Sequence, residues 1–577
     1  MSVSPPPTPG STSQITVTAQ RPKQPLVNYP QCFVEIYPFE GGTYVFTGGQ
    51  QGIIRCDVEK SIDVDEPGRF TITLAPGGPK GPNTTPLWNE VITPMSLCLI
   101  GMTRGLYQTI TMVGLVRSAT VAEDWTGGPV QKRIIITGED FYLFFKQTPW
   151  LSLTFLALPG AAAAATAVGL NTSQGVAFLS QAYNAATPGA FAQRYFTTIM
   201  AGAGGVLNNT QFPYNAGNVT FPDAMGYLFQ EFPNVTIPFG GFFQSTGGNW
   251  SEMFHEAMPF PWYEFFVITA DQGVASSQYS GVTQPKKGFT MKSLGPDIKC
   301  SPYVIGRVNP LPHLPVKASG QSATFQAIDV TAWNALKQYK PDSSYLFVEQ
   351  SFDDNEVMNF YIINPTYMKT LFGDSNSSPL SFMFQFLGCF DPASIHRYGF
   401  RPLYKDTHWF NDATGSFAQQ GSGGDFQTVV ATLTAFLASY HEPTPNMSKG
   451  ACMGPLRPDI IPGNRWTFPP FKGQGTWDFY VNAVKHSFVF GGQSSTTLTL
   501  TRGLPSTVYA DSSQAGILTQ AHLGNAQRKD GKLQTGVPAG LGSTLQFLNP
   551  TTINGLAPIL SNNAKSLTTP QGGTGHS

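Results

Sequence analysis

Charged residues are scarce in this chain of 577 residues, since Asp, Glu, Lys and Arg together make up only 12%, about half of their usual share. The formal net charge is −1, and no run of Lys or Arg is present that could follow a phosphate backbone. Nucleic-acid binding is therefore unsupported. A neutral surface with 60 Gly and 47 Pro favours a subunit of a large assembly over a freely diffusing enzyme.

The sequence also lacks the patterns of disulfide, metal and cofactor sites. No CxxC pair occurs, and neither a GxSxG, a GxxxxGK[ST] nor an HExxH motif is found. We therefore predict no cofactor. We expect the six widely separated cysteines to be buried free thiols, made in a reducing cytoplasm: Cys32, Cys56, Cys98, Cys300, Cys389 and Cys452.

Long apolar runs and secretory signals are missing as well. The most apolar stretch, from Trp150 to Leu170, is interrupted by Pro159 and Gly160 and carries Ser and Thr. A membrane helix needs about 20 mostly apolar residues, so we expect this stretch to be buried or interfacial and predict no membrane span. The N-terminus, MSVSPPPTPGSTSQ, has neither the basic nor the apolar region of a secretory signal.

What the chain does contain is a series of short strand-like runs separated by Gly, Pro and Asp. The clearest lies between residues 456 and 504, where FYVNAVKHSFVF and STTLTLTRG are joined by Gly491-Gly492-Gln493-Ser494. Alternation with a period of two and a glycine-rich gap predict a β-hairpin. The alternation further predicts that Leu498 and Leu500 face a core, while Thr497 and Thr499 face outward.

The predicted fold is mainly β with α+β parts, and the length suggests three to five domains. Helices are predicted near Glu139, at 174–186, at 223–229 and from Trp250. The predicted divisions are a flexible arm at 1–28, a small antiparallel β-barrel at 29–147, an Ala/Gly/Phe-rich insertion at 148–245, an α+β domain at 246–335, a region at 336–510 with a helix at 426–440, and a low-complexity tail at 511–577. The family resemblance given below implies that the region at 336–510 is a second small barrel.

Two groups of residues near predicted helices could carry chemistry. Glu139 and Asp140 follow a strand and Gly138, where carboxylates stabilise a helix N-terminus, and a catalytic carboxylate pair is the rival interpretation. His255 and Glu256 could be half of a metal site, but without HExxH a pair on a helix surface is favoured.

Two further groups lie in turn-rich sequence. Asp353, Asp354 and Glu356 could bind Ca²⁺ through hard oxygen ligands, but the spacing and glycine of an EF-hand are missing, so a solvated loop is favoured. His396 and His408 form the only close pair of histidines and have no third ligand nearby. We therefore predict no catalytic, cofactor-binding or metal-binding residues.

Several motifs occur in an order that resembles the tail baseplate hub proteins of bacteriophages. The resemblance extends from Phe33 to Pro505 and leaves the insertion and both tails unexplained. It rests on EPGRFTITL, MVGLV and RIIITGEDFYLFF, then NWSEMFHEAMPFPWYEFFVIT and the strand from Tyr303 to Arg307, then VEQSFDDNEVMNFYIINP and SIHRYGFRPLY, and finally PDIIPGNRW, YVNAVKHSFVFGG and TTLTLTRGLP.

This resemblance implies a structural protein of the virion rather than an enzyme. Hub proteins of this kind form homotrimers in which two barrels from each chain continue the tail tube. The implied partners are a tail tube or distal tail protein, a central spike protein and other baseplate proteins, with DNA only passing through the channel. Assembly in the host cytoplasm is implied too. The alternatives are a tail-associated enzyme that degrades cell walls, or a tail protein that binds a host receptor.

Overall fold

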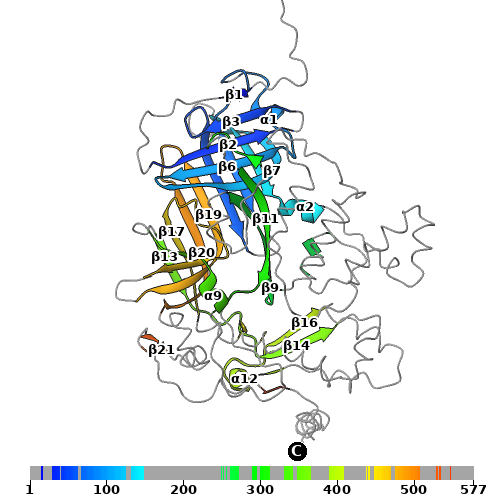
Figure 1. Ribbon diagram of the computed structural model, residues 1–577, viewed down its shortest axis with the longest axis vertical. Helices are drawn as coiled ribbons and strands as arrows, with labels where there is room; N and C mark the ends of the chain where they lie inside the picture. Colours follow the sequence, from blue (N-terminus) through cyan, green and yellow to red (C-terminus); the bar gives the residue numbers. More distant parts are fainter. Residues whose placement is uncertain are drawn as a thin grey trace, which may run out of the picture.

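The computed structural model describes most of the strand-forming sequence (Figure 1). The described residues are 14–16, 29–38, 41–62, 67–82, 84–124, 131–147, 249, 251–252, 255, 260–271, 289–294, 299–311, 331–341, 347–365, 389–390, 392–407, 437, 440–441, 447–469, 475–506, 528–529, 532–533 and 546–547. Within these residues, strands predominate, and the prediction of a mainly β fold is confirmed.

One sheet of 14 strands joins an early part of the chain, up to residue 140, to a later part, from residue 338 to residue 505. Its first part comprises β1 (Gln14–Thr16), β2 (Gln31–Tyr37), β3 (Thr43–Thr47), β4 (Ile53–Ser61), β5 (Arg69–Leu74), β6 (Leu97–Arg104), β7 (Tyr107–Asp124) and β8 (Gln131–Asp140). Its second part comprises β12 (Gln338–Tyr339), β13 (Phe347–Ser351), β17 (Ser448–Pro455), β18 (Arg465–Phe468), β19 (Trp477–Val489) and β20 (Ser495–Pro505). The main path runs β1-β3-β2-β6-β7-β8-β5-β4-β19-β20-β17-β13.

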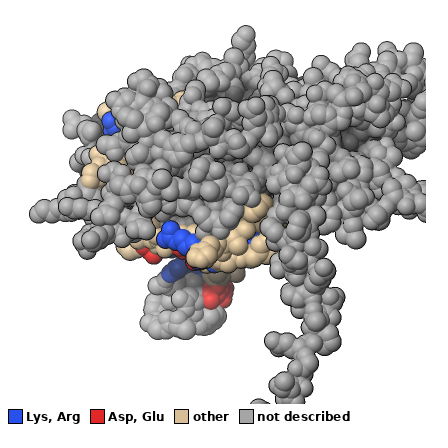
Figure 2. All heavy atoms as spheres, turned by 90° about the horizontal axis from the view of Figure 1, so that it is seen from below, with Lys and Arg blue, Asp and Glu red and all other residues tan. Residues whose placement is uncertain are grey.

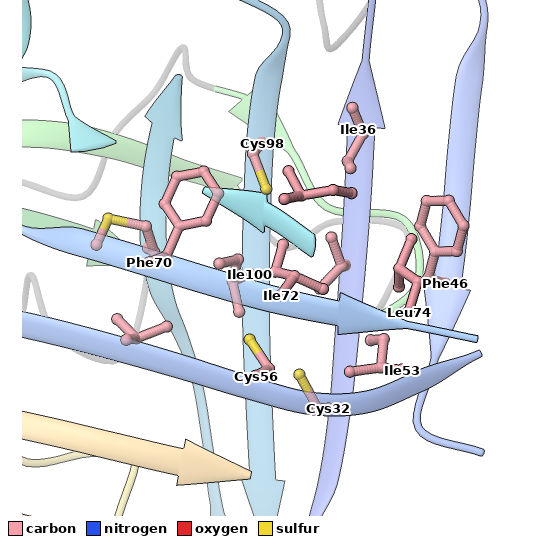
Figure 3. Packing of buried hydrophobic residues seen from close by; sticks show 14 of the residues in the cluster. Cys32, Ile36, Phe46, Ile53, Cys56, Phe70, Ile72, Leu74, Cys98 and Ile100 are labelled. Carbon is pink, nitrogen blue, oxygen red and sulfur yellow. The ribbon is translucent and has the colours of Figure 1, made fainter. Parts of the chain in front are cut away.

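The first part of the sheet curls around an apolar core. Side chains from the neighbouring strands β2 and β3 meet those of β4 there, although β4 stands far from both in the sheet order, and Cys32 lies beside Cys56 (Figure 3). Trp88, in the short helix α1 (Trp88–Val91), closes this core against the rings of Tyr44 and Phe46. Bulges in the β4–β5, β6–β7 and β7–β8 ladders increase the local twist that such curling requires.

The described strands do not close into the two barrels expected from the sequence. Between β3 and β4 there is one isolated bridge, Gly48 to Ile53, instead of a ladder. The free side of β4 pairs with β19 through seven residue pairs, from Ala483↔Ser61 to Val489↔Arg55. Because the backbone groups that would close the first barrel are engaged there, the two strand sets form one continuous sheet.

The predicted hairpin is confirmed. Strands β19 and β20 are antiparallel, with the turn at 490–494, and Leu498 and Leu500 are only 2% and 1% exposed. Thr497 is half-buried and Thr499 is exposed. A bulge between Val481 and Ala483 shifts the register, so the inward side of β19 changes from odd to even positions. This bulge explains why the sequence shows apolar residues on both faces of that strand.

The middle of the chain contributes two smaller sheets. Strands β9 (Tyr263–Asp271), β10 (Phe289–Thr290) and β11 (Lys299–Val308) form the first, in the order β10-β11-β9. It packs beside β7, and Glu35 of β2 accepts the N–H of Ser293 at 2.5 Å. The second contains β16 (Pro402–Thr407), β14 (Phe360–Pro365), β15 (Cys389–Phe390) and β23 (Gln546–Phe547), next to α12 (Pro392–Tyr398). A further pair joins β21 (Arg528–Lys529) and β22 (Lys532–Leu533), and α9 spans Thr331–Ala335.

The helix predicted to begin near Glu139 begins later. Strand β8 continues to Asp140, and α2 spans Tyr142–Gln147. The reason is that Gly138 is not a turn residue: a Cβ placed there would lie 2.1 Å from Cζ of Phe70. Strand packing therefore requires this glycine, and the chain leaves the strand only after the following two residues.

Other predicted helices fall mainly outside the described residues. The helices at 174–186 and 223–229 lie outside them entirely, whereas Ser251, Glu252 and His255 of the helix predicted from Trp250 are helical. Of the helix at 426–440, only Leu437 and Tyr440 are described, and both are helical. In the part of the chain that the structure describes, no helix combines the length and apolar character needed to cross a membrane.

Candidate functional site: polar joints between distant motifs

Motifs far apart in the sequence meet in three polar contacts that we call joints. The Asp140 joint consists of Lys60, Gly68, Asp140 and Thr269. The Glu264 joint consists of Glu264, Arg307, Gly463 and Tyr480. The Arg401 joint consists of Asp354, Asn359, Gly399 and Arg401.

The Asp140 joint connects two motifs of the first strand set, EPGRFTITL and RIIITGEDFYLFF. Oδ2 of Asp140 accepts the N–H of Gly68 at 3.0 Å, and Oδ1 accepts the N–H of Tyr142 at 3.0 Å. Asp140 thereby ties the EPG turn to the first residue of α2. The neighbouring Glu139 lies near Arg117 instead, with Oε2 3.9 Å from Nε. The two carboxylates have separate partners, so nothing in this geometry resembles a shared catalytic pair.

Lys60 extends this joint to the sheet of β9 to β11. Its Nζ donates to Oγ1 of Thr269 at 2.8 Å, and the same oxygen accepts the N–H of Val113 at 3.0 Å. Burial raises the pKa of Asp140 to about 6, against the opposing effects of Lys60 and the two N–H donors. Burial lowers the pKa of Lys60 to about 8, opposed by Asp140. Both groups are therefore charged between about pH 6 and pH 8.

The Glu264 joint contains a buried ion pair between Glu264 and Arg307. Oε2 of Glu264 accepts from Nε of Arg307 at 3.0 Å, and Oε1 accepts the hydroxyl of Tyr480 at 2.5 Å. Nη2 of Arg307 donates to the carbonyl of Gly463 at 2.6 Å. The strand from Tyr263, the strand ending near Arg307, the PDIIPG turn and the closing hairpin thus share one network.

Local backbone geometry places the partners in this network. Gly463 has φ +79°, a conformation that favours glycine, and an added Cβ would lie 2.6 Å from Cζ of Phe266. Burial raises the pKa of Glu264, and Arg307 is the main opposing influence. The joint therefore depends on pairing, since an isolated carboxylate at this depth would be strongly disfavoured.

The Arg401 joint explains the RYGFR motif. The amide of Asn359 donates to the carbonyl of Gly399 at 2.7 Å and accepts the N–H of Arg401 at 2.8 Å. The guanidinium of Arg401 then donates from Nη2 to Oδ2 of Asp354 at 2.8 Å. Gly399, with φ +79°, turns the chain after α12 so that this pairing is possible. The acidic loop and RYGFR are two halves of one contact.

The three carboxylates considered as a Ca²⁺ site all have basic partners. Nζ of Lys449 lies 3.2 Å from Asp353 and 2.6 Å from Glu356, and Arg401 pairs with Asp354. In the view from below, basic and acidic residues lie close together on the described surface (Figure 2). Among the residues that the structure describes, no three His, Cys, Asp or Glu side chains gather as ligands for a metal ion.

Two of the described histidines, His255 and His486, form hydrogen bonds within the fold. Nε2 of His255 lies 2.8 Å from the hydroxyl of Tyr142, while Glu256 and His408 lie outside the described residues. His396 is in α12. His486 is buried, with Nδ1 2.9 Å from Oγ1 of Thr496 and Nε2 3.1 Å from the carbonyl of Ile460. Burial lowers its pKa to about 4, so it is neutral at pH 7 and fixes the PDIIPG turn to the hairpin.

The sequence prediction singled out Asp140, but it did not identify the other buried charged residues of the first two joints: Lys60, Glu264 and Arg307. A signal existed for Lys60, which follows Cys56 and Val58 at intervals of two and therefore shares their inward face. Glu264 and Arg307 offered no comparable signal. Their strands are apolar on both faces, and their pairing follows from a strand register that spacing does not reveal.

Comparisons with known proteins found similarity only at the level of structure. No family model matches this chain, and no curated protein matches it. A 43 kDa tail protein of prophage MuSo2 from Shewanella oneidensis is 10% identical, with a TM-score of 0.38, covering 83% of this chain and 99% of its own. A tail protein from Neisseria meningitidis is 8% identical, with a TM-score of 0.38, covering 82% and 96%.

A third similar structure is an E. coli component of the type VI secretion system, described as structurally similar to the T4 bacteriophage tail proteins gp27 and gp5. It is 7% identical, with a TM-score of 0.30, and the match covers 78% of this chain and 73% of that one. These three structures are two tail proteins, one of them from a prophage, and a component of a type VI secretion system. TM-scores this low establish no shared function, and the function proposed below rests on this chain's own residues.

Proposed function

We propose that this protein is a structural subunit of a phage tail, specifically a baseplate hub. In this proposal three copies form a ring that joins the tail tube to the central spike and surrounds part of the genome-ejection channel. The ladder between β4 and β19 carries the proposal. It joins β4, from the N-terminal part of the region that resembles hub proteins, to β19, from the C-terminal part, in one continuous sheet. A chain that contributes two neighbouring segments to the wall of a tube requires such a connection.

The joints support a role for the middle of the chain in transmitting force. Lys60 and Glu264 bind across sheet boundaries, so the sheet of β9 to β11 is fixed to both strand sets by buried polar contacts. Directional contacts of this kind specify one relative position. A subunit that transmits force between tube and spike needs a fixed arrangement of its parts.

The charge composition fits a channel through which DNA passes. Only 12% of residues are charged and the net charge is −1, so a wall built from this chain would not retain a polyanion by counterion release. The partners in this proposal are the tail tube or distal tail protein, the spike and other baseplate proteins. The proposed location is the baseplate of the virion, after assembly in the host cytoplasm.

The solution mass tests the ring directly. Light scattering of the purified chain should give three times its mass of 62.4 kDa, and negative-stain microscopy should show rings with three-fold symmetry. A monomeric mass at every concentration would contradict the proposal. Incubation with peptidoglycan in a gel should leave it intact, because a cleared band would instead favour an enzyme that degrades cell walls.

A further inference from the structure

The outer edge of β3 is covered by a strand from the N-terminal arm. Gln14, Ile15 and Thr16 pair in parallel with Thr43, Tyr44 and Val45 (Figure 1). On its other side β3 pairs with β2. The ring of Tyr44 contacts Trp88 at a centroid distance of 5.2 Å, and that of Phe46 contacts it at 4.8 Å. This edge is therefore firmly held and accepts an added strand.

The chain between β1 and β2 is longer than this pairing requires. Strand β1 is parallel to β3 and β2 is antiparallel to it, so the end of β1 and the start of β2 lie toward the same end of the sheet. Two strand spacings, roughly 10 Å, separate them across the sheet, and about four residues, roughly 13 Å, separate them along the strands. Residues 17–30 connect them, and 14 extended residues span roughly 46–50 Å. Tyr29, just before β2, is 46% exposed.

We propose that β1 of one copy pairs with the β3 edge of a second copy, so that neighbouring subunits exchange arms. The inference rests on the proposed function because it requires copies side by side in a ring. The partner is defined chemically: β3 offers a row of backbone N–H and C=O groups, and the arm supplies the segment Gln-Ile-Thr that already matches this edge.

The competing arrangement involves β13, the strand at the other end of the sheet. Strand β13 pairs with β17 on one side, and in the described sheet order it is the terminal strand. Phe347 at its start is 51% exposed. If β13 of a second copy occupied the β3 edge, the arm would be displaced from it. That outcome would overturn the exchange of arms.

Engineered cysteines distinguish pairing within a chain from pairing between chains. Gln14 and Thr43 are direct partners, so Gln14→Cys and Thr43→Cys place two thiols across the β1–β3 pair. The two single variants are co-expressed and oxidised with diamide, which takes up two electrons and two protons as the disulfide forms. Each single variant alone is the control for reaction with the native cysteines, five of which are buried.

We expect the mixture of single variants to give a disulfide-linked pair of chains on a non-reducing denaturing gel, absent from either variant alone. The double variant should give linked species of the same copy number as the native oligomer. A disulfide confined to one chain in the double variant, with none in the mixture, would overturn the exchange. So would the absence of any disulfide, which would show that β1 does not occupy this edge.

The solution mass of the parent protein distinguishes a failure of the arm exchange from a failure of the proposed function. A native trimer with a disulfide confined to one chain would leave the ring standing and remove only the exchange of arms. A monomeric parent would remove the ring, whatever the arms do. Peptide mass spectrometry of the linked species should identify the segments around positions 14 and 43 as the partners.

Discussion

The core of the first strand set and the joints that hold the middle sheet use opposite chemistry. The core is made of Cys, Ile, Val, Leu, Met and aromatic side chains from β2 to β8, together with Phe488 of β19 (Figure 3). The joints bring buried charges together instead, with Lys60 near Asp140 and Arg307 against Glu264.

This difference indicates that the stability of the fold and the relative position of its sheets come from different interactions. Apolar burial contributes about 25 cal/mol per Å² but tolerates small displacements. A buried ion pair adds little net stability because desolvation offsets the attraction, yet it is costly to break. We infer that the apolar core holds the strand set folded, whereas the joints select one position for the sheet of β9 to β11.

The largest effect should come from placing charge in an apolar core. Replacing Leu498 and Leu500 with Asp buries two unpaired carboxylates among the side chains of the second core, at several kcal/mol each. We expect loss of the fold, measured by circular dichroism and by melting temperature.

The matched control changes Thr497 and Thr499 to Asp on the opposite face of the same strand, where one residue is half-buried and the other exposed. This variant should stay folded. If light scattering shows it as a folded monomer, the outward face is the contact between copies in the ring. A Leu pair that folds and assembles like the parent would contradict the burial of these two side chains.

The next effect tests whether a joint is costly to break. Arg307→Met removes the cation that faces Glu264 and leaves a carboxylate that is 2% exposed. We expect a loss of roughly 3–5 kcal/mol in the free energy of unfolding, measured with urea. Adding Glu264→Leu to this variant should recover part of the loss, since the unpaired charge is then gone. A double variant less stable than the single variant would show that the carboxylate is stabilised by its other partners.

A smaller effect concerns the dependence of stability on pH. Folding raises the pKa of Asp140 from its ordinary value of 3.8 to about 6, so the folded chain keeps this proton where the unfolded chain has released it. The stability contributed by Asp140 is therefore complete below about pH 4 and is lost as the pH rises through about 6. The size of the change is on the order of 2–3 kcal/mol.

Asp140→Asn isolates this change because asparagine does not titrate. The free energy of unfolding should be measured for parent and variant from pH 4 to pH 8, and the parent's advantage over the variant should shrink across that range. An advantage that grows with pH would mean that Lys60 and the two N–H donors outweigh the burial of the carboxylate.

Local patterns in the sequence predicted the hairpin, whereas long-range pairing decided the rest. The alternation of Leu and Thr and the glycines at 491–492 are signals within one segment, and β19 and β20 follow them. The pairing of β4 with β19 joins residues more than 400 positions apart. Neither strand carries a sequence signal that identifies the other as its partner. The prediction of two closed barrels was wrong because it did not include this pairing. All of the predicted domain bounds stay predictions.

The order of the motifs indicated which segments are important, but it did not predict which of them contact each other. The acidic loop, RYGFR and PDIIPG were each recognised separately, and their physical meaning lies in the joints. Asp354 illustrates the limit. The sequence placed Asp354 in a possible Ca²⁺ site. In the structure the cation beside it is the guanidinium of Arg401, 47 positions away in the chain.

The smallest effect should come from the ion pair at the surface. Asp354 and Arg401 are 53% and 33% exposed, so water already screens their attraction, and such pairs contribute about 0–1 kcal/mol. Asp354→Asn should therefore lower the free energy of unfolding by less than about 1 kcal/mol, with a smaller difference at high salt. The same measurement on Arg307→Met serves as the buried reference. If both variants lose the same amount, burial does not distinguish these joints, and the middle sheet is positioned by its strand contacts alone.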